Sequence, residues 1–358
     1  MRYKLSPKNT VIVRGPADVT LLDGQATILG APFTLGSRKT IASQKQLPIE
    51  AENRAELEIS IGKRGEVFEI QGSTIPGSWR LAAETLEEMR EGKVVVVGPP
   101  DVGKSTLCVY LVNRLFEGGQ SVAVVDADIG QADMGPPTTI ANAVSSQPIT
   151  SLQEMTPDRR LFIGHTTPAG VDHKLTRGIQ RLTSGNERQL TIVNTDGWIA
   201  DLGAILYKIN LLTEINPDLV LGLAYSNELE PILGGVGLHS MRIGASEDFL
   251  ERSRVDRRSI RAEGYRRFLE GATTHTIDLE RARFSFPKLS GVELSDRRAF
   301  KDLIVGILDK EGFLIEIGIL TKFERDVATI YSRHAGEFRN IEAGHVKISK
   351  TGREMGFL

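Results

Sequence analysis

The segment at residues 98–106, GPPDVGKST, has the Gly-x-x-x-x-Gly-Lys-Ser/Thr spacing of a phosphate-binding loop. It directly follows the apolar run at residues 94–97 and precedes apolar residues at helical spacing up to residue 117. A strand that turns through glycines into a helix directs backbone N–H groups at a polyphosphate. A chance glycine-rich loop is the alternative, and this context argues against it. We predict nucleotide binding by Gly98, Pro99, Pro100, Asp101, Val102, Gly103, Lys104, Ser105 and Thr106.

Lys104 and Ser105 have separate roles in such a loop. The lysine reaches the β- and γ-phosphates, and the hydroxyl holds Mg²⁺. A second group of polar residues follows the next predicted strand: Asp126, Asp128 and Gln131. Carboxylates there can hold Mg²⁺ or take the proton of an attacking hydroxyl, although Asp-x-Asp is also a common solvated turn. Because they lie one strand and one helix after the loop, we assign Asp126 to the metal, Asp128 to the base and Gln131 to a polar substrate contact.

Two later strand ends also carry polar or aromatic residues. Thr166 and Thr167 offer hydroxyl and N–H groups that suit a phosphate or sugar, or that cap the following helix equally well. His165 is interpreted as a structural histidine. Trp198 stands in a glycine turn, where it could stack on a base or seal the core. Asp196 could be a third acidic group near the metal or a cap, and we favour the cap.

An arginine-rich segment, ERSRVDRRSIRAEGYRR, occupies residues 251–267 and has seven arginines against three acidic residues. On a helix, Arg254, Arg258 and Arg261 share one face, and Arg257 lies beside Arg261. A solvated helix face is the common explanation of such a run, but solvated faces usually include lysine. Arginine suits bidentate phosphate contacts and the charge of a transferring phosphoryl group. We therefore predict a helical lid over the phosphates.

The chain changes character twice along its length. Residues 1–78 contain short β-like runs with close turn signals, which predict a small β-sandwich-like domain. Residues 79–272 alternate strands with helices, which predicts an α/β P-loop domain with a mostly parallel sheet. Residues 273–358 are β-rich again and predict a third, smaller domain. The central strands are expected at residues 94–97, 121–125, 161–163, 191–193 and 219–223, and the helices at 81–90, 104–117, 174–183, 202–215 and 251–267.

Composition excludes several classes of protein. The 358 residues include 44 Lys and Arg against 46 Asp and Glu, and this near balance argues against a general nucleic-acid coat. No apolar run approaches the length of a membrane span, and the first ten residues lack the apolar core of a signal peptide. We expect a cytoplasmic protein with no membrane association. The single cysteine, Cys108, excludes an intramolecular disulfide and fits a core position.

Taken together, the motifs resemble those of the polynucleotide 5′-hydroxyl kinases. That family includes the RNA-kinase subunit of the eukaryotic mRNA cleavage factor and the kinases of pre-ribosomal RNA processing. The similarity spans residues 98–271. It lies in the order and approximate spacing of the phosphate loop at 98–106, Asp-x-Gly-Gln at 128–131, Thr-Thr-Pro at 166–168, Thr-x-Gly-Trp at 195–198 and the arginine run at 252–261.

This resemblance implies transfer of the γ-phosphate of ATP, with Mg²⁺, to the 5′-OH end of RNA or DNA. It gives Asp128 the role of base and, with Lys104, Arg252 and Arg257, places it among the catalytic residues. The resemblance also implies that the N-terminal domain helps to enclose the adenine. Asp126 stands where the cleavage-factor branch has a glutamate, which leaves its metal role open. The remaining expected substrate contacts are Gln131, Thr166, Thr167, Trp198, Arg258 and Arg261.

Two other functions compete with the kinase. The first is a catalytically silent ATP-binding scaffold of an RNA-processing complex, whose protein partners the sequence does not identify. The second is a GTPase-like switch, which is disfavoured because no Asn/Thr-Lys-x-Asp motif follows the phosphate loop. The kinase is favoured on chemical grounds as well, because a 5′-OH is a weak nucleophile. It needs a carboxylate, a metal and cationic charge over the phosphates, and the sequence supplies candidates for all three.

Overall fold

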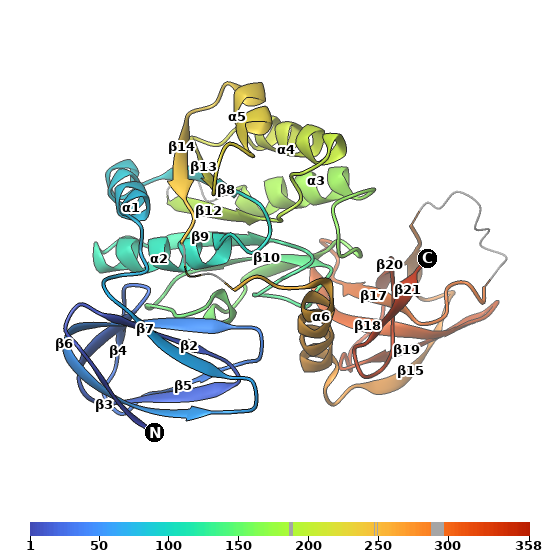
Figure 1. Ribbon diagram of the computed structural model, residues 1–358. Helices are drawn as coiled ribbons and strands as arrows, with labels where there is room; N and C mark the ends of the chain where they lie inside the picture. The colour runs from blue at the N-terminus through green and yellow to red at the C-terminus, as the bar shows by residue number, and fades with distance from the viewer. Residues whose placement is uncertain (186–188, 247, 249, 288–296) are drawn as a thin grey trace.

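The computed structural model describes residues 1–185, 189–246, 248, 250–287 and 297–358. Three β-sheets follow one another along the chain, each with seven strands in this described part. Figure 1 shows helices on both faces of the central sheet and a β-rich unit on each side of helix α6. The predicted fold class, a central α/β domain with two β-rich flanks, is therefore confirmed. The predicted boundary after residue 78 falls in the first turn of α1, and the one after residue 272 falls directly before β15.

The first sheet is built around two long, bent strands, β3 and β6. Its hydrogen-bonded order is β4-β3-β6-β2-β7, with β1 paired to β6 and β5 to β3. Strand β3 continues through Asp23 and Gly24 with register shifts that mark an irregular, bulged strand. The strands are β1 (Arg2–Leu5), β2 (Thr10–Arg14), β3 (Ala17–Ile28), β4 (Ala31–Phe33), β5 (Arg38–Ile41), β6 (Gln46–Ile61) and β7 (Glu66–Ile70).

The central sheet has the order β11-β10-β9-β12-β8-β13-β14. Strands β9, β12, β8, β13 and β14 are parallel, whereas β10 runs antiparallel to both β9 and β11. The sheet is thus mostly parallel as predicted, but the sequence analysis missed β10 and β14. The strands are β8 (Gly92–Val97), β9 (Val122–Ala127), β10 (Thr139–Val144), β11 (Arg159–Phe162), β12 (Leu190–Thr195), β13 (Leu219–Ala224) and β14 (Ser240–Gly244).

Helices cover both faces of the central sheet. Val94 and Val96 of β8 pack in the same core as α1 and α2, while Val95 and Val97 pack in the core of α3, α4 and α5. The alternation of side chains along a strand produces these two faces. The helices are α1 (Gly77–Met89), α2 (Lys104–Glu117), the 3₁₀ turn η1 (Leu152–Glu154), α3 (Asp172–Thr183), α4 (Leu202–Ile215), α5 (Glu230–Val236) and α6 (Arg254–Leu269).

The third sheet has the order β15-β19-β18-β17-β20-β16, with β21 paired to β20. Its core includes Tyr265 and Leu269 of α6 and Phe162 of β11, so it packs against both elements. The β-rich character predicted for residues 273–358 is present. The strands are β15 (Thr273–Asp278), β16 (Arg283–Ser285), β17 (Leu303–Leu308), β18 (Leu314–Phe323), β19 (Val327–Ser332), β20 (Asn340–Ile348) and β21 (Glu354–Phe357).

The first and central sheets are joined through α2. The buried Asn113 amide donates hydrogen bonds of 2.8 Å to the carbonyls of both Leu29 and Ile149, and its oxygen accepts one from the Ile149 N–H. Cys108 of the same helix is buried in the core, as expected. Within the described residues, no helix is long and apolar enough to cross a membrane.

Candidate active site

A cleft of about 1660 Å³ brings the predicted motifs together between the N-terminal domain and the central domain with its helix α6. It is bordered by the phosphate loop, the carboxyl ends of β9 and β12, the loop after β11, α6, and the N-terminal segment around β5 and β6. Strands β9, β12 and β8 are parallel, so their carboxyl ends meet at one edge of the sheet. The predicted residues that line the cleft are Pro99, Pro100, Asp101, Val102, Gly103, Lys104, Ser105, Thr106, Asp128, Gln131, Thr166, Thr167, Trp198, Arg252, Arg257 and Arg261.

Lys104 is folded back onto the phosphate loop. Its side chain is buried, and Nζ donates hydrogen bonds of 2.9 Å to the Gly98 carbonyl and 2.7 Å to the Pro99 carbonyl. Burial lowers the pKa of Lys104 to about 8, although the charge of Asp128 opposes that shift. A phosphate in the loop would supply the negative charge that this buried ammonium lacks. The lysine is therefore positioned for an anionic ligand.

Asp128 lies in a turn that its own carboxylate stabilises. Oδ1 accepts hydrogen bonds from the backbone N–H groups of Gly130, at 3.1 Å, and Gln131, at 2.9 Å. Burial raises the pKa of Asp128, while Lys104 and these two N–H groups oppose the rise. A Cβ on Gly130 would lie 2.8 Å from the Thr166 carbonyl, so only glycine allows this close approach. The acidic turn at residues 126–131 and the threonine loop at residues 164–168 are thus held against each other.

Asp126 is buried behind Asp128, at the end of β9. Its Oδ2 accepts hydrogen bonds from the N–H groups of Asp133, at 2.7 Å, and Met134, at 3.1 Å. Its Oδ1 accepts one from Nδ2 of Asn194, and the same Nδ2 donates to Oγ of Ser105. Burial and the carboxylate of Asp133 raise the pKa of Asp126. The two predicted metal ligands, Ser105 and Asp126, therefore share one hydrogen-bond donor.

The threonine loop contacts the C-terminal sheet through His165. Its Nδ1 accepts a hydrogen bond of 3.0 Å from the Thr167 N–H. Its ring lies 5.2 Å, edge to face, from the ring of His345, and stacks 5.3 Å from the ring of Phe357. The histidine therefore helps to pack the threonine loop against β20 and β21, in keeping with its interpretation as structural.

Trp198 lines the cleft and is held by neighbouring side chains. Its indole N–H donates a 2.7 Å hydrogen bond to Asp201, and its ring stacks on Tyr207 with a centroid separation of 5.9 Å. The predicted cap role of Asp196 is wrong, because Asp201 caps α4. Asp196 instead accepts from Trp198 N and forms a 2.8 Å ion pair with the fully buried Lys208. A Cβ on the intervening glycine, Gly197, would lie 2.6 Å from Pro100 N, so the tryptophan turn touches the phosphate loop.

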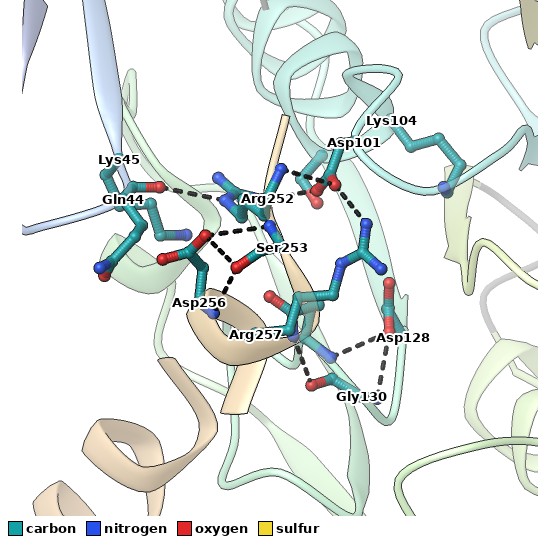
Figure 2. A network of polar contacts seen from close by, with 12 residues as sticks. Gln44, Lys45, Asp101, Lys104, Asp128, Gly130, Arg252, Ser253, Asp256 and Arg257 are labelled. Atoms are coloured by element: carbon teal, nitrogen blue, oxygen red, sulfur yellow. Dashed lines mark hydrogen bonds and ion pairs between the residues drawn. The ribbon is translucent and has the colours of Figure 1, made fainter. Parts of the chain in front are cut away.

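The lid arginines contact the phosphate loop itself. Figure 2 shows Arg252 and Arg257 reaching toward Asp101, the fourth residue of the loop. Nη1 of Arg252 lies 3.3 Å from Oδ1 of Asp101, and Nη2 of Arg257 lies 2.5 Å from Oδ2. Ser253 and Asp256 form a capping box that begins α6 between them. One carboxylate of the phosphate loop therefore holds both lid arginines over the loop.

The second half of the arginine run is arranged differently. Glu354, a buried residue of β21, pairs with Nε of Arg261 at 2.5 Å and lies 3.7 Å from Nε of Arg258. Arg258 is 62% exposed, whereas Arg261 is 14% exposed and reaches the edge of the cleft. In this structure both predicted substrate contacts join α6 to the C-terminal sheet, and Arg258 lies outside the cleft lining.

Several residues that line the cleft or support its walls were not predicted from the sequence. Gln44 and Lys45 come from the N-terminal domain: the Gln44 carbonyl accepts from Nε of Arg252 at 3.0 Å, and Lys45 pairs with Asp133 at 3.0 Å. Asn194 and Glu354 were missed as well. Only Asn194 had a local signal, as a buried polar residue at the end of an apolar strand. The others pair across 88 or more residues of sequence, which no local pattern reveals.

A family model and several relatives of known name are similar to this chain. The family model described as mRNA cleavage and polyadenylation factor CLP1 P-loop matches residues 98–271. A polyribonucleotide 5′-hydroxyl-kinase of Pyrococcus furiosus is 28% identical over 324 residues, which cover 75% of this chain and 91% of that protein. A kinase of the same name from Methanocaldococcus jannaschii is 26% identical, with 74% and 90% covered. A CLP1 homolog of Anopheles gambiae is 24% identical, with 84% and 73% covered.

Solved structures show the same fold. The structure of the wild-type Clp1p–Pcf11p complex contains a chain that matches this one with a TM-score of 0.72 and 14% identity. The match covers 97% of this chain and 98% of that chain. The similarity therefore extends over all three sheets rather than the phosphate-loop domain alone.

Proposed function

We propose that this chain, a member of the family of CLP1 proteins and polyribonucleotide 5′-hydroxyl-kinases, is an ATP-dependent polynucleotide 5′-hydroxyl kinase. It transfers the γ-phosphate of ATP to the 5′-OH end of RNA or DNA. One observation carries the proposal: a phosphate loop, the half-buried carboxylate of Asp128 and two lid arginines line the same cleft. Phosphoryl transfer depends mainly on positioning and on charge over the phosphates, and these residues supply both.

The donor side of the cleft is formed by the phosphate loop and the lid. Lys104 would exchange its two carbonyl partners for the β- and γ-phosphates, which are better partners for a buried ammonium. Arg252 and Arg257 lie above the loop on Asp101. Nε of Arg257 is buried and has no hydrogen-bond partner among the described residues.

The metal that such kinases use fits the residues present. Ser105 Oγ and Asp126 Oδ1 share the Asn194 donor, so two oxygen ligands of the kind that Mg²⁺ prefers lie together beside the loop. Mg²⁺ is usually bound by one or two protein oxygens, with waters and phosphates completing its shell. When bound, it would neutralise charge on the transferring phosphoryl group.

The acceptor side is formed by Asp128, the threonine loop and Trp198. The 5′-oxygen gives its proton to the Asp128 carboxylate as its bond to the γ-phosphorus forms and the bond from that phosphorus to the bridging oxygen of ADP breaks. The raised pKa of Asp128 suits this acceptance. Gln131, Thr166 and Thr167 surround the point where the 5′ end would lie, and Trp198 offers a face for stacking a base.

A labelling experiment tests the proposal. The chain is incubated with γ-labelled ATP and matched single- and double-stranded oligonucleotides of RNA and of DNA, each with a 5′-OH. Oligonucleotides that already carry a 5′-phosphate are the control. We expect label only on the 5′-OH oligonucleotides. If the chain binds nucleotide but transfers no label to any oligonucleotide, the result supports the silent scaffold instead. The similarity to a chain solved in complex with Pcf11p is the observation that favours this alternative.

A further inference from the structure

Asn194 lies between the two strands that carry the phosphate chemistry. It is the fifth residue of β12, and in the parallel register it faces Val96 of β8 on one side and Asp126 of β9 on the other. β8 leads into the phosphate loop and β9 into the acidic turn. Asn194 is 1% exposed, and burying its polar side chain costs free energy unless the amide is hydrogen-bonded.

The Asn194 amide group is only half satisfied. Both hydrogens of Nδ2 have acceptors, at 3.1 Å in Ser105 Oγ and at 3.2 Å in Asp126 Oδ1. The carbonyl oxygen, Oδ1, is buried and has no hydrogen-bond partner in the described part of the chain. In this orientation Nδ2 donates to the Ser105 hydroxyl and to the Asp126 carboxylate, which accepts hydrogen bonds when it is ionised. A buried acceptor without a partner is costly, and it is retained here beside a proposed metal site.

We infer that Asn194 is a positioning residue for the metal site: through Nδ2 it holds the Ser105 hydroxyl and the Asp126 carboxylate together. This inference rests on the proposed function, since it concerns the Mg²⁺ of that site. The other oxygen of Asp126 is anchored by the N–H groups of Asp133 and Met134. Asn194 thus fixes the one carboxylate oxygen that remains to be oriented.

The contacts of Ser105 support the same conclusion. A serine hydroxyl has two lone pairs and one hydrogen. The Asn194 donor occupies one lone pair and leaves the other for a cation. Partners that orient metal ligands in this way usually change metal affinity by about 10- to 100-fold when they are removed. A purely structural asparagine would instead affect the stability of the chain and all ligand binding alike.

The test measures binding without any acceptor oligonucleotide. A non-hydrolysable ATP analogue is titrated calorimetrically into the full chain, in EDTA and at a series of Mg²⁺ concentrations. For Asn194→Ala we expect metal-free binding within about 2-fold of the wild type and an apparent Mg²⁺ affinity about 10- to 100-fold weaker. The matched control is Thr191→Val on the same strand, because Thr191 is also buried and its hydroxyl has no partner among the described residues. It should leave both quantities unchanged.

Three outcomes would overturn the inference: an unchanged Mg²⁺ affinity in Asn194→Ala, an equal loss of metal-free and metal-dependent binding, or the same loss in Thr191→Val. If Asn194→Ala does not fold, Asn194→Ser replaces it, because a shorter side chain with one donor cannot serve both acceptors. Failure of the proposed function is separately visible. If the wild type transfers no phosphate but its Mg²⁺ affinity is weakened by Asn194→Ala, the kinase proposal is contradicted and the role of Asn194 is supported. If the wild type transfers phosphate and the Mg²⁺ affinity of Asn194→Ala is unchanged, the kinase proposal is supported and the role of Asn194 is contradicted.

Discussion

Replacing Asp101 by asparagine should open the lid without harming the nucleotide site. Asp101 is the one carboxylate of the phosphate loop, and its side chain is only 5% exposed. It accepts from Nη1 and the backbone N–H of Arg252 and from Nη2 of Arg257. Asparagine keeps the shape of the side chain but removes the charge that holds both guanidinium groups. We therefore expect the lid arginines to lose their ordered position over the loop.

The size of the effect follows from the exposure of the pairs. Hydrogen bonds to charged groups contribute about 1.5–3 kcal/mol, whereas exposed ion pairs contribute about 0–1 kcal/mol. Arg252 and Arg257 are 22% and 29% exposed, so each pair lies between these limits, at about 1 kcal/mol after solvent screening. Two pairs give about 2 kcal/mol, which is about a 30-fold change in the population of the ordered lid.

The assay separates turnover from nucleotide affinity. If the arginines act on the transferring phosphoryl group, kcat for phosphorylation should fall by about 30-fold. The Kd for ATP should stay equal or decrease, because the variant removes a negative charge beside the phosphates. The control is Glu337→Gln, which breaks an ion pair with Arg339 outside the cleft lining, where the two side chains are 74% and 60% exposed. A Kd that rises while kcat stays constant, or a control that loses as much turnover, would refute this reasoning.

The remaining predictions concern the acceptor side and the pH dependence. Asp128→Asn should lower single-turnover phosphate transfer by about 100-fold or more and leave the Kd for ATP within about 2-fold; a fully active variant would remove Asp128 from the base role. Trp198→Ala should raise the KM for the oligonucleotide by about 10-fold, with the KM for ATP unchanged, because stacking contributes about 1–3 kcal/mol per base. Burial lowers the pKa of His165 below its ordinary 6.5, and burial, His165 and Lys174 together lower that of His345. The unfolded chain then binds protons first as the pH falls, so the melting temperature should drop below about pH 6.5 and should drop less in His345→Gln; equal pH profiles would contradict this cause.

Local sequence patterns predicted the parts of the site that local structure determines. The phosphate loop, the acidic turn and the tryptophan turn each follow an apolar strand, and parallel strands necessarily bring such ends to one edge. Asp128, Thr167 and Trp198 therefore meet as expected, even though β10 was missed. Because β10 pairs antiparallel with both neighbours, β11 still points the same way as β9. The threonine loop after β11 therefore lies at the same edge of the sheet as the acidic turn after β9, although β10 was not predicted.

Local sequence patterns did not predict the contacts that depend on distant parts of the chain. Residues 139–144, TIANAV, follow a proline-rich turn and become a strand only because β9 and β11 offer edges to pair with. The lid arginines were recognised, but their partners were not: Asp101 lies 151 residues from Arg252, and Glu354 lies 93 residues from Arg261. Charge alone does not say which carboxylate an arginine will meet. The expected cytoplasmic location and the roles of the site residues remain predictions.

The most direct test of the central claim is where the phosphate goes in a single turnover. The chain is preloaded with γ-labelled ATP, mixed with a 5′-OH RNA oligonucleotide, quenched, and digested to nucleoside 5′-monophosphates. We predict that the label appears only in the 5′-terminal monophosphate and is absent when Asp128→Asn replaces the wild type. Label released as inorganic phosphate, or retained in ATP by a chain that binds it, would contradict the account.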